Sequence, residues 1–188
     1  METVFIPFTR YLVDDFIDEW AKLVNDSYLR AGASVHILIW PRVESPPIKC
    51  FNFNRAQYHS TCILSWLYEV LASRVSTYYF IGIGYIDAYV ERLNFVFGEA
   101  APGMRVAAVY TKRLLPQFYG YEPNYNLYYE RVAKEIVHEL GHLFNLSHCI
   151  DRKCVMSFSN SVNEVDLKSR FFCSKCSRSL VSYMSKTK

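Results

Sequence analysis

Three of the five histidines in this chain lie within eleven residues of one another, and a glutamate follows the first of them. They are His138, His142 and His148, with Glu139 after the first, in an H-E-x-x-H pattern extended to a third histidine. Positions i and i+4 of a helix lie on one face with their Cβ atoms about 6 Å apart. The imidazoles of His138 and His142 can therefore bind one ion, and the spacing predicts a metal site.

His148 can join this pair only if the helix ends soon after His142. In a continued helix, His148 would lie about 9 Å further along the axis and about 240° around it. Asn145 lies between them, and asparagine tolerates the left-handed conformation better than most residues. We therefore expect Asn145 to end the helix in that conformation, so that the chain turns and His148 returns to the metal.

A zinc ion held by three neutral imidazoles keeps a fourth position for water, which is typical of catalytic zinc sites. Zinc lowers the pKa of its bound water toward about 7. Glu139 lies beside the histidine pair, so it can take the proton of that water and pass it to a leaving amine. The pattern predicts hydrolysis with Glu139 as general base, and a metal site without hydrolysis is the alternative.

Four of the six cysteines lie in the last 40 residues, as C-x4-C followed by C-x2-C. They are Cys149, Cys154, Cys173 and Cys176. Four thiolates suit one closed tetrahedral zinc site, and two disulfides are the alternative. A closed site leaves no position for substrate, so we expect this zinc to be structural and to fix the segment that carries His148.

The composition is that of a folded protein, with 51% apolar and 21% charged residues among 188. No apolar run reaches the roughly 20 residues that cross a bilayer, and the N-terminus lacks a basic start followed by an apolar stretch. We therefore predict a cytoplasmic protein without a membrane segment. In that compartment Cys50 and Cys62 are expected to be buried free thiols, with a bond between them as the alternative.

Basic residues are concentrated near the C-terminus, where residues 167–188 hold six Lys or Arg and no acid. The formal net charge of the whole chain is only +3. Such a segment can contact nucleic acid or an anionic surface, but a solvated terminus explains it more simply. We predict peptide or protein substrates, no nucleic-acid partner and a monomer.

Hydrophobic periodicity predicts the elements that position these residues. Strands are expected at 3–8, 34–40, 77–85, 94–99 and 105–111, and helices from 9 to about 24, from 54 to about 71 and from about 126 to 143. The Pro-Gly turn between the last two strands predicts an antiparallel hairpin. The periodicity fades beyond the last helix, so we divide the chain into an upper part, 1–145, and a C-terminal part, 146–188.

Three stretches together resemble the signature of the archaemetzincins, which are minimal metzincin metallopeptidases of the archaelysin family. They are HELGHLFNLSHC at 138–149, CVM at 154–156 and CSKC at 173–176. The resemblance implies that the three histidines bind the catalytic zinc, Glu139 is the general base and the four cysteines hold a second zinc. It also implies that Met156 is the Met-turn residue beneath the metal.

Two positions depart from the signature. Asn145 stands where the family has glycine, and the 16 residues between Met156 and Cys173 are one fewer than in the family pattern. Asparagine is a tolerable substitute for a left-handed glycine. The shorter spacer falls in a loop, so it affects the register there rather than the metal site.

The resemblance also implies an α+β fold of the metzincin (zincin) type. It consists of a twisted mixed sheet, a backing helix and an active-site helix above a cleft, with a small irregular C-terminal subdomain stabilised by zinc. Residues 94–99 would form the edge strand at the rim of the cleft, where an extended peptide can add its backbone hydrogen bonds. The implied function is that of a zinc metallopeptidase, aminopeptidases included, with two zinc ions per chain. The alternative is a zinc-stabilised protein that binds peptides or nucleic acid with little or no turnover.

Overall fold

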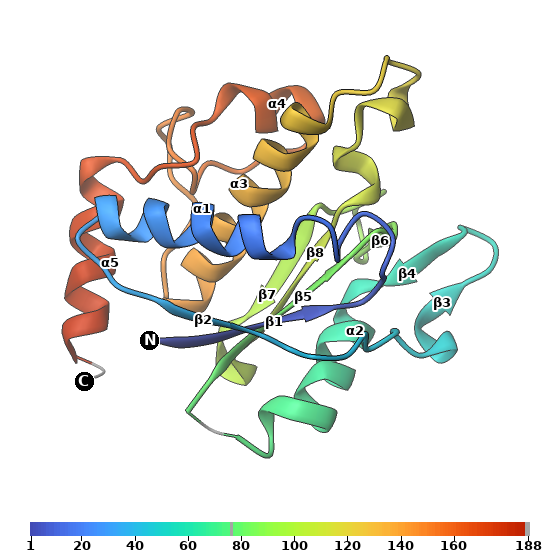
Figure 1. The fold of residues 1–188 in the computed structure, drawn as a ribbon, viewed down its shortest axis with the longest axis horizontal. Helices are drawn as coiled ribbons and strands as arrows, with labels where there is room; N and C mark the ends of the chain where they lie inside the picture. Colours follow the sequence, from blue (N-terminus) through green and yellow to red (C-terminus); the bar gives the residue numbers. More distant parts are fainter. Residues whose placement is uncertain (76, 187–188) are drawn as a thin grey trace.

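The structure, a computed structural model, describes residues 1–75 and 77–186 (Figure 1). Its main sheet contains β1 (Glu2–Pro7), β2 (His36–Ile39), β5 (Tyr79–Gly84), β7 (Gly98–Ala101) and β8 (Val106–Tyr110). The spatial order is β2-β1-β5-β8-β7, and only β7 runs antiparallel to its neighbour. This twisted mixed sheet, covered by helices, confirms the predicted α+β fold.

Helices cover both faces of the sheet, because the central strands are apolar on both sides. One face carries α1 (Ile17–Arg30) and α3 (Tyr125–Leu143), and the other carries α2 (Ser60–Leu67) (Figure 1). Successive side chains of a strand point to opposite faces. Phe5 of β1 therefore packs with α1 and α3, whereas Val4 packs with α2. The helix α3 is thus packed against one face of the sheet, beside α1.

The first helix begins later than its apolar periodicity predicts. Residues 10–16 form turns, and α1 starts at Ile17. Leu12 has a φ of 54°, a left-handed conformation that a right-handed helix cannot include. Val13 is nevertheless buried in the same core as α1. The apolar pattern therefore continues through buried residues that precede the helix, and it does not locate the start of α1.

The second helix is also shorter than predicted, since a small three-stranded sheet occupies part of its range. This sheet contains β3 (Phe51–Asn52), β4 (Gln57–His59) and β6 (Ala88–Tyr89). The predicted helix does not begin at Asn54, because this residue lies in the turn between β3 and β4, where its N–H donates to the side chain of Asn52. The cap of α2 is His59, whose Nδ1 accepts from the N–H of Cys62 at 3.3 Å.

Cys50 and Cys62 form a disulfide, so the expectation of two free thiols is wrong. Cys50 ends the short helix η1 (Ile48–Cys50), and Cys62 lies in the first turn of α2. The β3–β4 hairpin between them returns the chain, which leaves the two Cα atoms 5.5 Å apart. That separation is within the range that a disulfide spans.

The predicted antiparallel hairpin is confirmed as β7 and β8, joined by η3 (Pro102–Met104). Its first strand is shorter than expected, because ladder pairing begins only at Gly98. Before that residue, Val96 makes a single bridge to Ala88 of β6. Since β7 is the last strand in the order, its outer edge is free to pair with another strand.

The remaining elements are short, except for one C-terminal helix. They are η2 (Tyr68–Ala72), η4 (Lys112–Leu114), η5 (Pro116–Tyr119), α4 (Val162–Leu167) and α5 (Ser174–Lys186). The sequence did not predict α5, whose buried residues Cys176, Leu180 and Met184 recur every four positions in an otherwise polar segment. These three side chains join the main core. Within the described residues, no helix is both long and apolar enough to span a membrane.

Candidate active site

The helix α3 carries the H-E-x-x-H residues and is fixed at its start and along its length. Its N-cap is Asn124, whose Oδ1 accepts a hydrogen bond from the N–H of Leu127 at 2.9 Å. Its apolar side, which includes Leu140, is buried against the sheet and α1. His138 and His142 project from the same helix one turn apart, so the packing of α3 also sets their positions.

The helix ends in a Schellman motif centred on Asn145. Asn145 has a φ of 63°, which confirms the predicted left-handed conformation. Its N–H donates to the carbonyl of His142 at 2.9 Å, and the N–H of Leu146 donates to the carbonyl of Gly141 at 3.0 Å. The carbonyl of Leu146 in turn accepts a hydrogen bond from Nδ1 of His142 at 2.7 Å. The turn that ends the helix therefore also orients one of the imidazoles.

The structure brings the three imidazoles together. One ring nitrogen of His138, His142 and His148 lies within 4.8 Å of the corresponding nitrogens of the others. The Nε2 atoms of His138 and His142 are 3.0 Å apart. Nδ1 of His138 donates to the carbonyl of Val155 at 2.7 Å, so this ring is fixed by the chain that follows His148.

The hydrogen bonds of the two helical histidines leave their Nε2 atoms as electron-pair donors. A neutral imidazole carries one proton, and in both rings the carbonyl partner holds it on Nδ1. Two lone pairs that face each other at 3.0 Å repel, and a cation bound to both nitrogens removes that repulsion. Burial lowers the pKa of all three histidines, which favours the neutral form that binds metals. The donor set therefore fits zinc.

Glu139 is buried beside the histidines, in contact with the edge strand. A Cβ at Gly98 of β7 would lie 2.5 Å from Oε1 and 2.6 Å from Cγ of Glu139, so only glycine allows this approach. Burial, followed by the nearby carboxyl of Glu135, raises the pKa of Glu139 well above its usual range. Chemical reasoning from the sequence missed the role of Gly98, although it lies in the predicted rim strand.

Met156 lies against α3 at Gly141, and this glycine falls between His138 and His142 in the sequence. A Cβ on Gly141 would overlap the sulfur of Met156, so the thioether occupies the space that a side chain would need. Met156 is fully buried in the main core. The residue assigned to the Met-turn is therefore packed beneath the helix turn that carries His138 and His142.

A cavity of about 410 Å³ opens in front of the histidines, between α3 and β7. The side chains that give it chemical character are His138, His142, His148, Glu139, Glu135 and Glu99. Phe95 and Phe97 line it from the segment around β7, and Phe158 lines it from the C-terminal part. A peptide paired with the free edge of β7 would lie in this cavity, with its carbonyl groups close to the histidines.

The four clustered cysteines are free thiols that face one another, and their sulfur atoms lie within 4.8 Å of one another. Cys154 Sγ accepts a hydrogen bond from the N–H of Cys173 at 3.3 Å, a contact typical of metal-binding thiolates. The N–H of Cys149 donates to the carbonyl of Met156 at 2.8 Å, which closes the loop between the first two cysteines. The set fits one tetrahedral zinc ion.

The basic C-terminal segment is not simply a solvated terminus. The side chain of Arg170 is 13% exposed, and that of Lys168 is 1% exposed and lies 2.8 Å from Oε1 of Glu135. Residues 187 and 188 of this segment lie outside the described residues. Two of its charges therefore belong to the interior of the fold, because acidic partners offset the cost of burying them.

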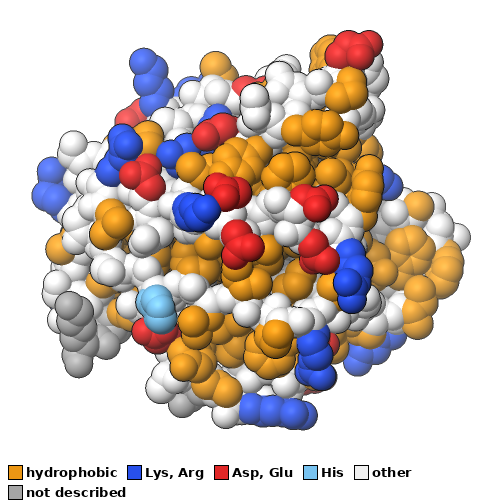
Figure 2. All heavy atoms as spheres, viewed as in Figure 1, with side chains coloured by type: hydrophobic (Ala, Val, Ile, Leu, Met, Phe, Trp, Pro, Cys, Tyr) orange, Lys and Arg blue, Asp and Glu red, His pale blue; other side chains and the backbone are white. Residues whose placement is uncertain are grey.

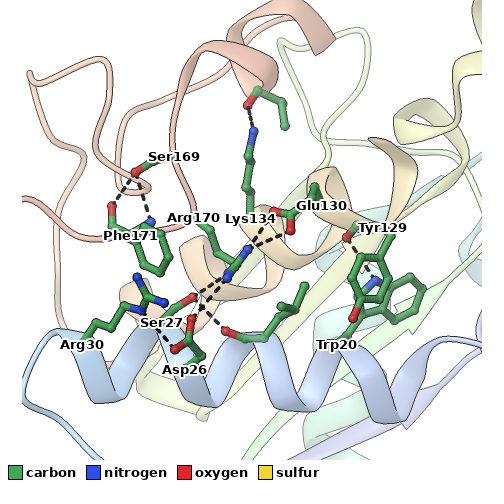
Figure 3. A network of polar contacts seen from close by, with 12 residues as sticks. Trp20, Asp26, Ser27, Arg30, Tyr129, Glu130, Lys134, Ser169, Arg170 and Phe171 are labelled. Carbon is green, nitrogen blue, oxygen red and sulfur yellow. Dashed lines mark hydrogen bonds and ion pairs between the residues drawn. The ribbon is translucent and has the colours of Figure 1, made fainter. Parts of the chain in front are cut away.

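Arg170 connects the C-terminal part to both long helices (Figure 3). Its guanidinium contacts Oε1 of Glu130 on α3 at 2.8 Å, and Oδ2 of Asp26 and Oγ of Ser27 on α1 at 3.2 and 3.1 Å. It also lies over the ring of Phe171 at 4.9 Å. One side chain thus anchors the segment that leads directly into Cys173.

A family model described as peptidase family M54 matches residues 3–182. Among curated proteins, the chain is 39% identical to archaemetzincin from Methanocaldococcus jannaschii over 168 residues, 89% of each chain. It is 38% identical to archaemetzincin from Thermococcus kodakarensis over 181 residues, 96% of each chain. These matches extend well beyond the motifs that carry the resemblance.

Solved structures are similar over nearly the whole chain. The structure of archaemetzincin from Methanopyrus kandleri superposes with a TM-score of 0.83 at 34% identity, covering 98% of this chain and 96% of that one. The structure of a zinc-dependent peptidase from Methanocorpusculum labreanum has a TM-score of 0.80 at 25% identity, covering 96% and 100%. The similarity therefore includes both the sheet and the cysteine-bearing segment.

Proposed function

This chain belongs to peptidase family M54, and from that premise we propose that His138, His142 and His148 hold its catalytic zinc while Glu139 is the general base. The enzyme is a zinc-dependent metallopeptidase, a hydrolase of the archaemetzincin type. The alternative of a zinc-stabilised binding protein with little turnover is not favoured.

A single observation carries the assignment of the ligands. The Nε2 atoms of His138 and His142 lie 3.0 Å apart, and both Nδ1 atoms are occupied by backbone carbonyls. Neither neutral ring can then donate a proton to the other, because its only N–H is already used. A shared cation removes the repulsion between the two lone pairs, and His148 supplies the third donor.

Zinc, when bound, would act as a Lewis acid that polarises the peptide carbonyl. It would also lower the pKa of a water molecule, so that the water loses a proton readily and can attack that carbonyl. The protein residues do the rest. A carboxylate oxygen of Glu139 takes the proton from the attacking water and delivers it to the nitrogen of the leaving amine. The free edge of β7 orients the substrate backbone, and the buried setting of Glu139 limits access by other water molecules.

We also propose a second zinc ion for each chain, held by Cys149, Cys154, Cys173 and Cys176. The convergence of four free thiols and the N–H donated to one of them support this assignment. All four positions would be filled by protein sulfur, so the role of this ion is structural. Met156 supports the catalytic site as the Met-turn residue through its contact with Gly141.

Several further features stay predictions. They are a monomeric state, a cytoplasmic location, aminopeptidase action and the division into residues 1–145 and 146–188. The main core includes Val155 and Leu180, so the two parts share it.

Nucleic acid is still not expected as a partner: on the face seen in Figure 2, acidic side chains gather over α1 and the basic ones are scattered around them.

The assignment of the general base is tested with Glu139→Gln, which removes the ionised carboxylate and keeps the shape of the side chain. We expect the zinc content to be unchanged and the hydrolysis of a mixed peptide library to fall by about 10² to 10⁴-fold. The matched control is Glu69→Gln, at an exposed glutamate of η2, which leaves hydrolysis unchanged. Equal hydrolysis by the wild type and Glu139→Gln, as measured by mass spectrometry of the products, would contradict the assignment.

A further inference from the structure

A buried ion pair lies beside the active-site cavity and takes no part in the chemistry described above. Nζ of Lys168 is 2.8 Å from Oε1 of Glu135, and the two side chains are only 1% and 4% exposed. In every other ion pair between described residues, at least one partner is more than 20% exposed. Glu135 is one of the side chains that line the cavity.

The pair joins the two sides of the cavity. Glu135 precedes Glu139 by one helical turn and shares its face of α3. Nζ of Lys168 also donates to the carbonyl of Ser157 at 3.4 Å, directly after Met156. Residues 157–160, which we call the wall segment, include three residues that line the cavity from the C-terminal part: Phe158, Ser159 and Asn160. One ammonium group therefore links α3 to the wall segment.

Stability does not account for this arrangement. A buried ion pair adds little or no stability relative to apolar side chains of similar size, because both charges lose their hydration. Neighbouring contacts already connect α3 to α4 and the residues around it. Arg131 binds Asp166 at 2.6 Å, and Nζ of Lys134 donates to the carbonyl of Val165 at 3.1 Å. The feature that distinguishes the Glu135–Lys168 pair is its contact with the cavity and its wall.

We propose that Glu135 and Lys168 are positioning residues that fix the distance between α3 and the wall segment, and thereby the width of the substrate cavity. Neither residue contacts the reacting atoms. The short ion pair is useful here because it fixes the separation of its two charged groups, whereas an apolar pair would let the wall shift along the helix and hold the substrate less tightly. The proposal rests on the proposed function only in taking this cavity as the place where substrate binds.

The test separates metal binding from cavity binding. Acetohydroxamate binds only the metal, whereas a dipeptide hydroxamate binds the metal and also fills the cavity. The variant is the double substitution Glu135→Gln with Lys168→Met, which removes both charges and avoids leaving one buried without a partner. The matched control is Lys134→Met, which makes the same lysine substitution at the same interface but away from the cavity.

In the zinc-loaded double variant we expect an unchanged thermal midpoint and unchanged binding of acetohydroxamate by calorimetry. Binding of the dipeptide hydroxamate should weaken about tenfold, and KM for a peptide should rise with little change in kcat. Lys134→Met should behave as the wild type with both probes. If the double variant does not fold, Glu135→Gln alone gives the same comparison, since the amide keeps the shape of the side chain and loses the charge that pairs with Lys168.

Wild-type binding of the dipeptide hydroxamate by the double variant would overturn the proposal. Equal weakening of both probes would also overturn it, because the pair would then act on the histidines rather than on the wall. Failure of the proposed function has a different outcome. A wild-type enzyme that binds the hydroxamates but hydrolyses no peptide would contradict the mechanism and leave the binding comparison intact.

Discussion

Two glycines in the active site are required because another side chain occupies the place of their Cβ. Gly98 allows β7 to approach Glu139, and Gly141 allows Met156 to pack against α3. Neither residue has a left-handed φ, so backbone freedom does not explain them. Their role is spatial, and each substitution should therefore affect catalysis by displacing a particular neighbour.

Replacing Gly98 by alanine should displace the carboxylate of Glu139. The new methyl group would lie 2.6 Å from Cγ of Glu139 and meet the inner part of that side chain as well as its tip. We expect kcat to fall about 10 to 100-fold with an unchanged zinc content, because Glu139, the proposed general base, is misplaced while the three histidines stay in place. Gly103→Ala is the control, since nothing lies within 4 Å of its Cβ. A Gly98→Ala enzyme with wild-type kcat would contradict this account.

Substitutions at Asn145 should follow the conformational preference of the left-handed region. Asn145→Ala should cost about 1 kcal/mol in the free energy of unfolding, because alanine lacks the polar side chain that eases this conformation. Asn145→Gly should be neutral or slightly stabilising, since glycine has no Cβ to clash. Urea unfolding of the zinc-loaded variants measures both values. Greater stability of the alanine variant than of the glycine variant would be inconsistent with a left-handed Asn145.

Among the elements, the sequence predicts best those that have a strong period and a clear end. The helix α3 was expected at about 126–143 and spans Tyr125–Leu143, because its apolar stripe is continuous and Asn145 marks its end. The start of α1 was not predictable, since the apolar pattern continues through the turns before Ile17. The helix α5 has a stripe of one residue per turn, too narrow to distinguish from a polar loop.

The contacts between elements were beyond prediction, because they depend on how the C-terminal part folds back. Composition marks Arg170 as one charge in a basic segment, and only the fold places Asp26 and Glu130 around it (Figure 3). Similarly, the predicted zinc ligands follow from spacing alone, whereas the approach of Lys168 to Glu135 does not. Metal-binding residues have a characteristic spacing along the sequence, but residues that join distant segments have none.

Arg170→Met should loosen the attachment of the C-terminal part to α1 and α3. Hydrogen bonds to charged groups contribute about 1.5 to 3 kcal/mol when buried, and the half-exposed acids here can regain water, so we expect a loss of about 1 to 2 kcal/mol. Arg178→Met is the control, at an exposed arginine of α5. Thermal unfolding of the zinc-loaded proteins distinguishes them. Equal midpoints for the two variants would mean that Arg170 does not anchor this segment.

Across the whole molecule, the two candidate metal sites are linked by covalent neighbours. Cys149 directly follows His148, and Cys154 directly precedes Val155, whose carbonyl accepts the hydrogen bond from His138. Two of the four cysteines therefore lie one residue from an imidazole or from the carbonyl that orients one. This region draws its order from the shared core and from the sulfur site, so each site should depend on the other.

Replacing Cys173 by serine tests this dependence at the sulfur site, at a position distant in sequence from the histidines. We expect the structural zinc to be lost and the catalytic zinc to bind about tenfold or more weakly, because His148 is then held by a less ordered segment. Zinc per chain and competition with a chelator measure the two effects. The control is the double variant Cys50→Ser with Cys62→Ser, which makes the same Cys-to-Ser change at the disulfide on the opposite side of the sheet. If the histidine site of Cys173→Ser bound zinc with wild-type affinity, the sulfur site could not be what orders His148, and the histidine site would fold independently of it.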